Sequence, residues 1–267
     1  MIKCLDHGFV RLVDHVGNDL SVVRAARVSH DAVWRTGVDE GKDEKLIHYL
    51  MKNHHTTPFE MVDFTFEIQA PIFVFRQWHR HRTWSYNEVS ARYTELPEVF
   101  YVPDLEKIGS QDEKNKQVRN IKDPARQYRV ETGFNYALNQ SRDLYIDKCK
   151  AAFDTYRFLL NRGWPRELAR SILPVSTYSH MFAKVDLHNL LHFLGLRLHA
   201  HAQYEIRVYA DAMYRLVKDI VPISIKAWES YKISYNDIEN KDQEITQLRE
   251  RINLLEQQLA EFKALSH

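Results

Sequence analysis

The sequence predicts an α+β fold in which an antiparallel sheet packs with helices, and three patterns support this prediction. Residues 62–69 alternate between apolar and polar side chains, which is typical of a strand with one buried face. Apolar residues recur at helical spacing in several longer segments, including long helices in the C-terminal half. A seven-residue apolar repeat near the C-terminus predicts a coiled-coil-like helical tail. We therefore expect one domain at residues 1–235 and a helical heptad tail at residues 236–267.

Short strands and helices are expected to alternate in the first part of the chain. Residues 8–13 are mostly apolar and suit an edge strand, and residues 20–28 and 42–52 have the apolar spacing of helices. The second helix should end in the histidine-rich loop that follows it. After the alternating strand, a proline suits the first position of a short helix at residues 71–81.

The rest of the domain is expected to be mainly helical. Residues 82–92 should form a loop, residues 93–103 an extended segment that ends in a strand, and residues 105–127 a polar and mobile surface excursion. Asp186 suits the N-cap of a helix whose leucines form a core stripe. The remaining helices are expected at residues 132–162, 166–172, 200–221 and 223–231.

The tail carries a heptad pattern with mostly Ile at one position and mostly Leu three residues later. The two series are Ile238, Ile245, Ile252 and Leu259, and Leu248, Leu255 and Phe262. The stripe is narrow and the repeat is strict, which favours a self-associating coiled coil. A helix packed on its own domain remains the alternative.

The composition is that of a globular protein with a sizeable core. The chain has 267 residues, 44% hydrophobic and 27% charged, with a formal net charge of +1. A charge so close to neutral argues against a general nucleic-acid binder. The N-terminus lacks the apolar core of a signal peptide, no apolar run is long enough to span a membrane, and there are two cysteines. We therefore expect a cytoplasmic protein without a membrane partner.

A cation-rich segment at residues 76–93 is the strongest candidate for a binding site. It combines four arginines with two histidines, two serines, an asparagine and one carboxylate, and large aromatic residues lie between the charges. Arginine forks and hydroxyl groups suit a phosphate, and the aromatic rings could stack on a flat ring. The alternative is a solvated basic helix followed by a turn. The eight glycines form neither a Rossmann fingerprint nor a P-loop, so side chains and helix ends would have to hold any nucleotide or flavin.

Later helices supply further candidates. Arg170 can meet the phosphate-binding residues of this segment, and Glu167, three residues earlier, either orients Arg170 through an ion pair or acts directly. Arg197 could stabilise negative charge that develops on a bound substrate, or its stem could simply lie along apolar surface. His188 and His192 are four residues apart and could bind a metal on one helix face or pack against a flat cofactor ring.

The chain offers no good nucleophile. Cys4 lies near the N-terminus, and Cys149 lies in an apolar helix where a thiolate would be unstable. Any reaction that this chain catalyses would therefore have to proceed without thiolate attack. Ser90 has arginine neighbours rather than a general base, so we interpret it as a phosphate ligand.

One signature in the cation-rich segment carries a family resemblance. Arg80-His81-Arg82, followed after seven residues by Ser90 and then by Arg92, resembles the signature of the flavin-dependent thymidylate synthases. The resemblance extends over about residues 8–231 and includes the stretch at 202–205. It implies conversion of dUMP to dTMP, with 5,10-methylenetetrahydrofolate as carbon donor and NADPH as the reductant of bound FAD. It also implies a homotetramer in which each active site is assembled from several subunits.

The resemblance also assigns roles to single residues. Arg197 matches the arginine taken to promote ionisation of the uracil ring at N3, which makes it the catalytic residue. Flavin contacts are implied for Ser29, Thr57, Arg80, His81, Arg82, Glu88, Asp186, His188 and His192. Nucleotide contacts are implied for Gln77, Trp78, His79, Arg80, Glu88, Val89, Ser90, Ala91, Arg92, Arg170 and Arg197. Asp186 and His192 stand where close relatives are expected to have asparagines, and no metal is implied.

Two alternatives stay open. One is a metal-dependent nucleotide phosphohydrolase, and the other is a nucleotide-binding protein without enzymatic activity that assembles through its coiled coil. Bound flavin that NADPH reduces faster in the presence of dUMP would distinguish the synthase from both.

Overall fold

The computed structural model describes residues 1–113, 116, 119–120, 135–231, 248 and 251–252, without the side chains of residues 135–138. The chain divides into two compact units, Met1–Trp228 and Glu229–His267. Most heptad positions of the expected tail lie outside the described residues, and the two that are described, Leu248 and Ile252, are exposed. Residues 121–134, which belong to the expected excursion and to the start of the long helix, also lie outside them. The fold below is that of the first unit.

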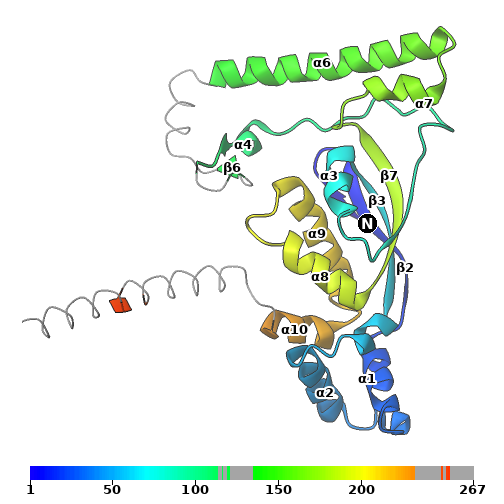
Figure 1. Ribbon diagram of the computed structural model, residues 1–267, viewed down its shortest axis with the longest axis vertical. Helices are drawn as coiled ribbons and strands as arrows, with labels where there is room; N and C mark the ends of the chain where they lie inside the picture. The colour runs from blue at the N-terminus through cyan, green and yellow to red at the C-terminus, as the bar shows by residue number, and fades with distance from the viewer. Residues whose placement is uncertain (114–115, 117–118, 121–134, 232–247, 249–250, 253–267) are drawn as a thin grey trace, which may run out of the picture. The chain divides into compact units, whose positions relative to one another are not determined.

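A five-stranded antiparallel sheet forms the centre of this unit, in the order β1-β2-β3-β7-β4 (Figure 1). The strands are β1 (Ile2–Cys4), β2 (Gly8–Val16), β3 (Asp63–Pro71), β4 (Ser85–Glu88) and β7 (Tyr178–Asp186). β3 and β7 pair along their whole length, from Asp63 opposite Asp186 to Pro71 opposite Tyr178. The expected antiparallel α+β fold is thus confirmed.

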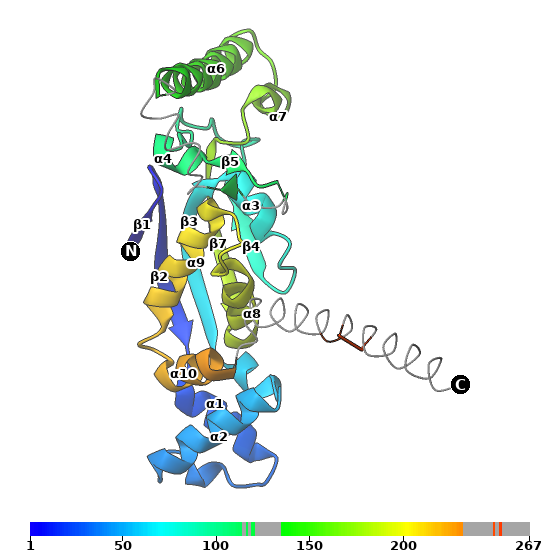
Figure 2. The same ribbon diagram turned by 90° about the vertical axis from the view of Figure 1, so that its left-hand side faces the viewer.

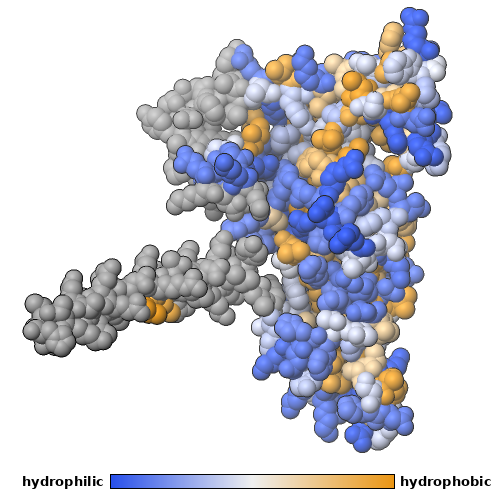
Figure 3. Space-filling view, viewed as in Figure 1, coloured by the Kyte–Doolittle hydropathy of each residue, from blue (hydrophilic) through white to orange (hydrophobic). Residues whose placement is uncertain are grey.

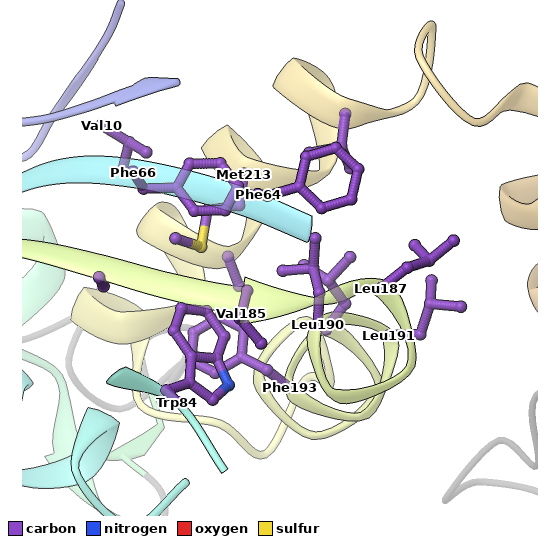
Figure 4. Packing of buried hydrophobic residues seen from close by; sticks show 14 of the residues in the cluster. Val10, Phe64, Phe66, Trp84, Val185, Leu187, Leu190, Leu191, Phe193 and Met213 are labelled. Carbon is purple, nitrogen blue, oxygen red and sulfur yellow. The ribbon is translucent and has the colours of Figure 1, made fainter. Parts of the chain in front are cut away.

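The two central strands bury every second side chain, and this alternation is why they lie at the centre of the sheet. The buried series are Phe64, Phe66 and Ile68 of β3, and Met181, Ala183 and Val185 of β7. Figure 4 shows Phe64, Phe66 and Val185 in one cluster with side chains of the helices that cover this face. Removing such side chains from water stabilises the fold by roughly 2 kcal/mol each. β7 was not expected, although its alternation is visible in the sequence.

Helices α8 (Leu187–Arg197) and α9 (Tyr204–Val217) cover this face of the sheet (Figures 1 and 2). Asp186 caps α8 as expected, because its Oδ1 accepts a hydrogen bond from the Asn189 amide at 2.9 Å. The expected core stripe of α8 is confirmed by the buried side chains of Leu187, Leu190, Leu191 and Leu194. The helix expected at 200–221 was too long at both ends, since a turn closed by the Ala202 amide and the His199 carbonyl precedes α9.

Three helices lie together at one end of the sheet: α1 (Asp19–Val28), α2 (Glu40–Lys52) and α10 (Pro222–Tyr231) (Figure 1). Asn18 caps α1 by accepting the Leu20 amide at 3.0 Å. The buried Asp19 carboxylate accepts the amides of Ile223 and Ser224 at 2.8 and 2.9 Å, so a negative charge lies at the start of α10. Two 3-10 helices, η1 (Val33–Arg35) and η2 (Thr57–Met61), join these elements to the rest.

A second, smaller core lies beneath α6 (Asn135–Asn161), α7 (Arg166–Ala169) and η4 (Arg170–Ile172). Its buried members are Phe100, Cys149, Phe153, Tyr156 and Ala169. Gly163 follows α6 with φ +83°, which confirms the expected role of glycine just past a helix end. This core positions α7, whose residues reach the site described below.

Several local expectations were wrong. β2 is not an edge strand along its first residues, because β1 pairs with them. The expected loop after residue 82 contains β4, which pairs with β7. Phe100 forms only an isolated bridge with Thr177, so there is no strand at 100–103. The excursion contains α4 (Leu105–Ile108) and a small hairpin of β5 (Ser110–Gln111) and β6 (Arg119–Asn120). In the described part of the chain, no helix has the length and apolarity to cross a membrane.

Candidate functional site

Helix α3 (Ile72–Trp78) carries the start of the cation-rich segment into the fold. Pro71, the last residue of β3, is its N-cap with φ −60° and ψ 144°, so the chain passes directly from strand to helix. The helix ends at Trp78 rather than near residue 81. Trp78 is fully buried, and its ring lies 4.9 Å from that of Phe193 on α8. Because the Trp78 side chain is held in the core, the polar residues beside it on α3 contribute to two groups of residues at separate places.

The first place is the α3–α7 pocket, a cavity of about 640 Å³ between α3, β4, the turn after β4, and α7. Its volume is in the range of small-molecule sites. Arg76 and Arg170 contribute two guanidinium groups to the lining, and Ser90 contributes a hydroxyl. That set of donors suits a phosphate. The other polar lining residues are His79, Glu88, Glu167, Ser171 and Ser179.

Pairing between β4 and β7 fixes the wall of this pocket. Glu88 ends β4 opposite Met181, and the Val89 amide donates to the His180 carbonyl at 2.8 Å. The buried Ser179 donates its Oγ to Glu88 Oε1 at 2.5 Å. The Glu88 carboxylate is therefore held in one orientation at the pocket, where it can accept hydrogen bonds from sugar hydroxyls.

The second place is the arginine–histidine cluster, formed by Gln77, His81, His192, Arg197 and Gln203 near the turn between α8 and α9. Arg197 donates a hydrogen bond from Nε to His81 Nε2 at 3.0 Å and one from Nη2 to the backbone carbonyl of Gln77 at 3.2 Å. Gln77 Nε2 donates to Gln203 Oε1. The rings of His81 and His192 lie 6.0 Å apart. The guanidinium is thus fixed by partners on α3 and on the residues that follow it.

Burial sets the charge state of this cluster. Burial, followed by the charges of Arg197 and His192, lowers the pKa of His81 to about 4. The ring is therefore neutral at pH 7, and its Nε2 can accept the hydrogen bond from Arg197. Burial also lowers the pKa of Arg197, but an arginine side chain remains protonated in proteins. The cluster presents a fixed positive charge beside a neutral histidine.

A third group of residues lines the α1–α2 pocket, a cavity of about 510 Å³ that includes Ser29 and Thr57. Arg27, on its wall, pairs through Nη2 with the buried Asp43, which also accepts the Gly37 amide at 2.8 Å. The other guanidinium nitrogen of Arg27, Nη1, is buried without a partner. The hydroxyls of Ser29 and Thr57 and the side chain of Arg27 at one cavity suit the sugar or phosphate groups of a dinucleotide cofactor such as FAD.

Many of the expected site residues belong to one of these three groups. The α3–α7 pocket is lined by His79, Glu88, Val89, Ser90, Ala91 and Arg170. The cluster includes Gln77, His81, His192 and Arg197, and the α1–α2 pocket is lined by Ser29 and Thr57.

The remaining expected residues lie outside the three places. Arg80, Arg82 and Arg92 are exposed, and the Arg92 guanidinium lies 5.4 Å from the Tyr93 ring centroid. The Trp78 side chain is in the core, which leaves only its backbone for a ligand. Both carboxylate oxygens of Asp186 bond to Asn189, and His188 is half-buried on α8.

Sequence reasoning missed part of the α3–α7 pocket. Arg76 was counted among the arginines of the segment but was not expected in the site. Arg76 precedes His79 by three residues on a helix, so the two side chains lie on the same face, and this spacing could have placed Arg76 in the site. Ser171 follows Arg170 and could have been found in the same way. Ser179 could not, because its contribution depends on the unexpected pairing of β7 with β4.

The described residues also bear on metal and thiolate chemistry. In the described residues, no three His, Cys, Asp or Glu side chains come together as metal ligands. Both cysteines are buried, and burial raises the pKa of Cys4 to about 12. Cys149 lies in the second core, with its Sγ 3.7 Å from Ser176 Oγ. The residues that line the two pockets include neither cysteine.

Comparisons with known proteins agree on one family. A family model described as thymidylate synthase complementing protein matches residues 11–223. A flavin-dependent thymidylate synthase from Ehrlichia ruminantium (strain Gardel) is 45% identical over 233 residues, which are 86% of this chain and 73% of that protein. One from Wolbachia pipientis wMel is 42% identical over 86% of this chain and 76% of its own length. The crystal structure of a UMP/dUMP methylase, PolB from Streptomyces cacaoi bound with 5-Br dUMP, has a TM-score of 0.71 and 35% identity, covering 86% of this chain and 98% of that one.

Proposed function

The chain belongs to the flavin-dependent thymidylate synthases, and from this premise we propose which of its residues carry the reaction. The enzyme converts dUMP to dTMP, with methylenetetrahydrofolate as carbon donor and with FAD that NADPH reduces. The observation that carries the residue assignment is the gathering of Arg76, Ser90 and Arg170 at one cavity.

The α3–α7 pocket binds the nucleotide. Arg76 and Arg170 balance the phosphate charges, and the Ser90 hydroxyl adds a neutral donor. Glu88, held by Ser179, accepts from the sugar. Glu167 lines the same pocket beside Arg170, where it orients that arginine.

Arg197 carries the electrostatic part of catalysis. Its guanidinium is oriented before the substrate arrives, because His81 and the Gln77 carbonyl already accept two of its hydrogen bonds. A donor fixed in advance stabilises developing negative charge on the uracil ring without reorganising during the reaction. Replacing Arg197 with Ala should leave flavin bound and lower kcat/KM for dUMP by about 10²-fold or more. Unaltered turnover would refute this role.

Ser29 and Thr57 hold one part of the flavin cofactor in the α1–α2 pocket, and Arg80, His81, Arg82, Glu88, Asp186, His188 and His192 hold the rest. When bound and reduced, the flavin supplies a hydride. The neutral His81 can pack against a flat ring without adding charge, and the half-buried His188 and the exposed His192 offer further rings on α8. Because both thiols are buried away from the pocket linings, the chain itself supplies no thiolate for the uracil ring.

A homotetramer would complete this site. Figures 1 and 2 both show α1 and α2 at one end of the sheet and α7 at the other, so the α1–α2 pocket and the α3–α7 pocket lie at opposite ends of one protomer. Apolar residues reach the surface around α7, in the upper part of Figure 3. Leu168, Ile172 and Val175 are 54%, 45% and 61% exposed there, which a second copy would cover. A cluster from one copy and a pocket from another would then form a single site.

The purified protein tests the function directly. We expect a yellow protein whose absorbance is bleached by NADPH, faster with dUMP, and which forms dTMP when methylenetetrahydrofolate is added. The metal-dependent phosphohydrolase predicts instead a colourless protein that releases phosphate from dUMP and loses this activity with a chelator. A protein that binds dUMP with neither activity would support the non-enzymatic alternative.

We also propose that residues 236–267 form a separate coiled-coil tail and that the protein is cytoplasmic. Deleting the chain after Tyr235 should spare catalysis but change its size in solution or its melting temperature, because self-association would be lost. An unchanged mass and melting temperature would dispose of the coiled coil. Recovery of the protein from a membrane fraction would contradict the location.

A further inference from the structure

Glu205 is a buried carboxylate in the first turn of α9 that the proposed reaction does not use. It is 1% exposed. Its Oε1 accepts hydrogen bonds from Arg119 Nη2 at 2.7 Å and from the Tyr101 hydroxyl at 3.1 Å, and its Oε2 accepts from Gln203 Nε2 at 2.9 Å. Burial, followed by the charge of Glu205, raises the pKa of Tyr101, so its hydroxyl remains a donor. Arg119 supplies the cation that a buried carboxylate needs.

A carboxylate surrounded by donors fixes the direction of the amides beside it. Because ionised Glu205 only accepts hydrogen bonds, Gln203 must turn its NH₂ group toward it, and its Oε1 then faces the other way. Gln77 donates its Nε2 to that Oε1, so the direction of its own amide is set as well. An amide turned by 180° has nearly the same shape, and only the hydrogen-bond network distinguishes the two orientations.

The network ends at the side chain of Gln77 on α3. The backbone carbonyl of the same residue accepts Arg197 Nη2 at 3.2 Å, and Arg197 Nε donates to His81. Hydrogen bonds therefore run from Arg119 through Glu205 and Gln203 to the side-chain amide of Gln77, a residue whose backbone meets the catalytic arginine.

Arg119 belongs to this network although it is distant from Glu205 in the sequence. It lies on β6 in the excursion, 86 positions from Glu205, and its side chain is 26% exposed. Its guanidinium also lies 5.9 Å from the Tyr204 ring centroid, and Lys107 of the same excursion lies 5.2 Å from that ring. The hydrogen bonds to Glu205, however, come from Arg119, Tyr101 and Gln203. Lys107 is thus a natural control for Arg119.

We propose that Arg119 is a positioning residue for dUMP: by pairing with the buried carboxylate of Glu205, it fixes the side-chain amide of Gln77 in the orientation that the nucleotide meets. This proposal rests on the proposed assignment of Gln77 to the dUMP site. It gives the excursion a role in substrate binding that its polar sequence does not reveal.

The test compares Arg119→Met, Arg119→Lys and Lys107→Met in the full-length holoenzyme. Without the cation, the buried carboxylate of Glu205 loses the partner that compensates its charge, and the hydrogen bonds that orient Gln203 and Gln77 are no longer held in place. We expect Arg119→Met to raise the KM for dUMP about tenfold, with a smaller change in kcat. Arg119→Lys keeps the charge and should restore most of the affinity. Lys107→Met should match the wild type.

A second variant separates positioning from general damage. Glu205→Gln should also raise the KM for dUMP, and adding Arg119→Met to it should change nothing further, because the carboxylate that Arg119 pairs with is gone. Calorimetric dUMP binding to the oxidised enzyme should follow the same order. The proposal is overturned if Arg119→Met lowers the melting temperature while dUMP binding stays unchanged. Wild-type enzyme that does not bind dUMP at all would overturn the proposed function, and this proposal with it.

Discussion

Arg197 Nε donates a hydrogen bond to His81 Nε2 over 3.0 Å, between residues 116 positions apart in the sequence. Only a neutral imidazole offers the lone pair that this bond requires. Burial, Arg197 and His192 together keep His81 in that form by lowering its pKa to about 4. The orientation of the proposed catalytic arginine is therefore coupled to the protonation state of one histidine.

This coupling predicts that the protein loses stability on acidification. The pKa of His81 is about 4 in the folded chain and 6.5 without the fold, so the unfolded chain binds more protons between these values. The contribution of His81 to stability is full above about pH 6.5 and falls by about 2 kcal/mol as the pH drops toward 4. Urea unfolding of His81→Asn should show a shallower pH dependence than the wild type over this window. His15→Asn, on the exposed part of β2, is the matched control, and equal slopes in all three proteins would contradict the assignment.

Ser179 should contribute to the affinity for dUMP even without contacting the nucleotide. Its hydroxyl holds Glu88 at the wall of the α3–α7 pocket with a hydrogen bond of 2.5 Å. A hydrogen bond to a charged partner contributes about 1.5 kcal/mol, so Ser179→Ala should weaken dUMP binding about tenfold. The measurement is calorimetric titration of dUMP into the oxidised enzyme. Ser171→Ala, at an exposed position in the lining of the same pocket, serves as control, and equal affinities in the two variants would refute the role.

The absence of a thiolate nucleophile can also be tested. Burial holds the pKa of Cys4 at about 12, and Cys149 lies in the second core. We expect the double variant Cys4→Ala, Cys149→Ala to keep most of its dTMP-forming activity and to lose about 1–3 kcal/mol of stability from the cavities. Turnover is measured at a temperature where circular dichroism shows the variant to be folded. A folded variant without activity would mean that a thiol takes part in the reaction.

Local patterns were enough to predict much of the fold. The spacing of apolar residues indicated α1, α2 and the long α6, because each buries one helical face. β3 was found because its alternation is strict, whereas β4 was missed because its four residues are mostly exposed. The excess length predicted for α9 has a different cause. The turn at 198–203 ends at Gln203, whose side chain contacts Gln77 on α3, and helical spacing does not show such a contact.

The site was harder to predict because it depends on pairing over long distances. The motif residues Glu88 and Ser90 reach one pocket, as the resemblance implied. Ser179, Glu205 and Arg119 contribute through hydrogen bonds to partners that lie between 2 and 104 positions away. Nothing in the residues around them marks such roles. The sequence therefore predicted residues that would contact a ligand more reliably than it predicted the residues that hold them in position.

The central claim is that one active site combines the α3–α7 pocket of one copy with the arginine–histidine cluster of another. Arg170→Ala and Arg197→Ala, each on a differently tagged chain, should be inactive alone for dTMP formation. When the two are co-expressed in equal amounts and mixed oligomers are purified through both tags, about a quarter of the sites should have both arginines intact. We predict dTMP formation at about that fraction of the wild-type rate, and mixed oligomers as inactive as either variant alone would contradict the account.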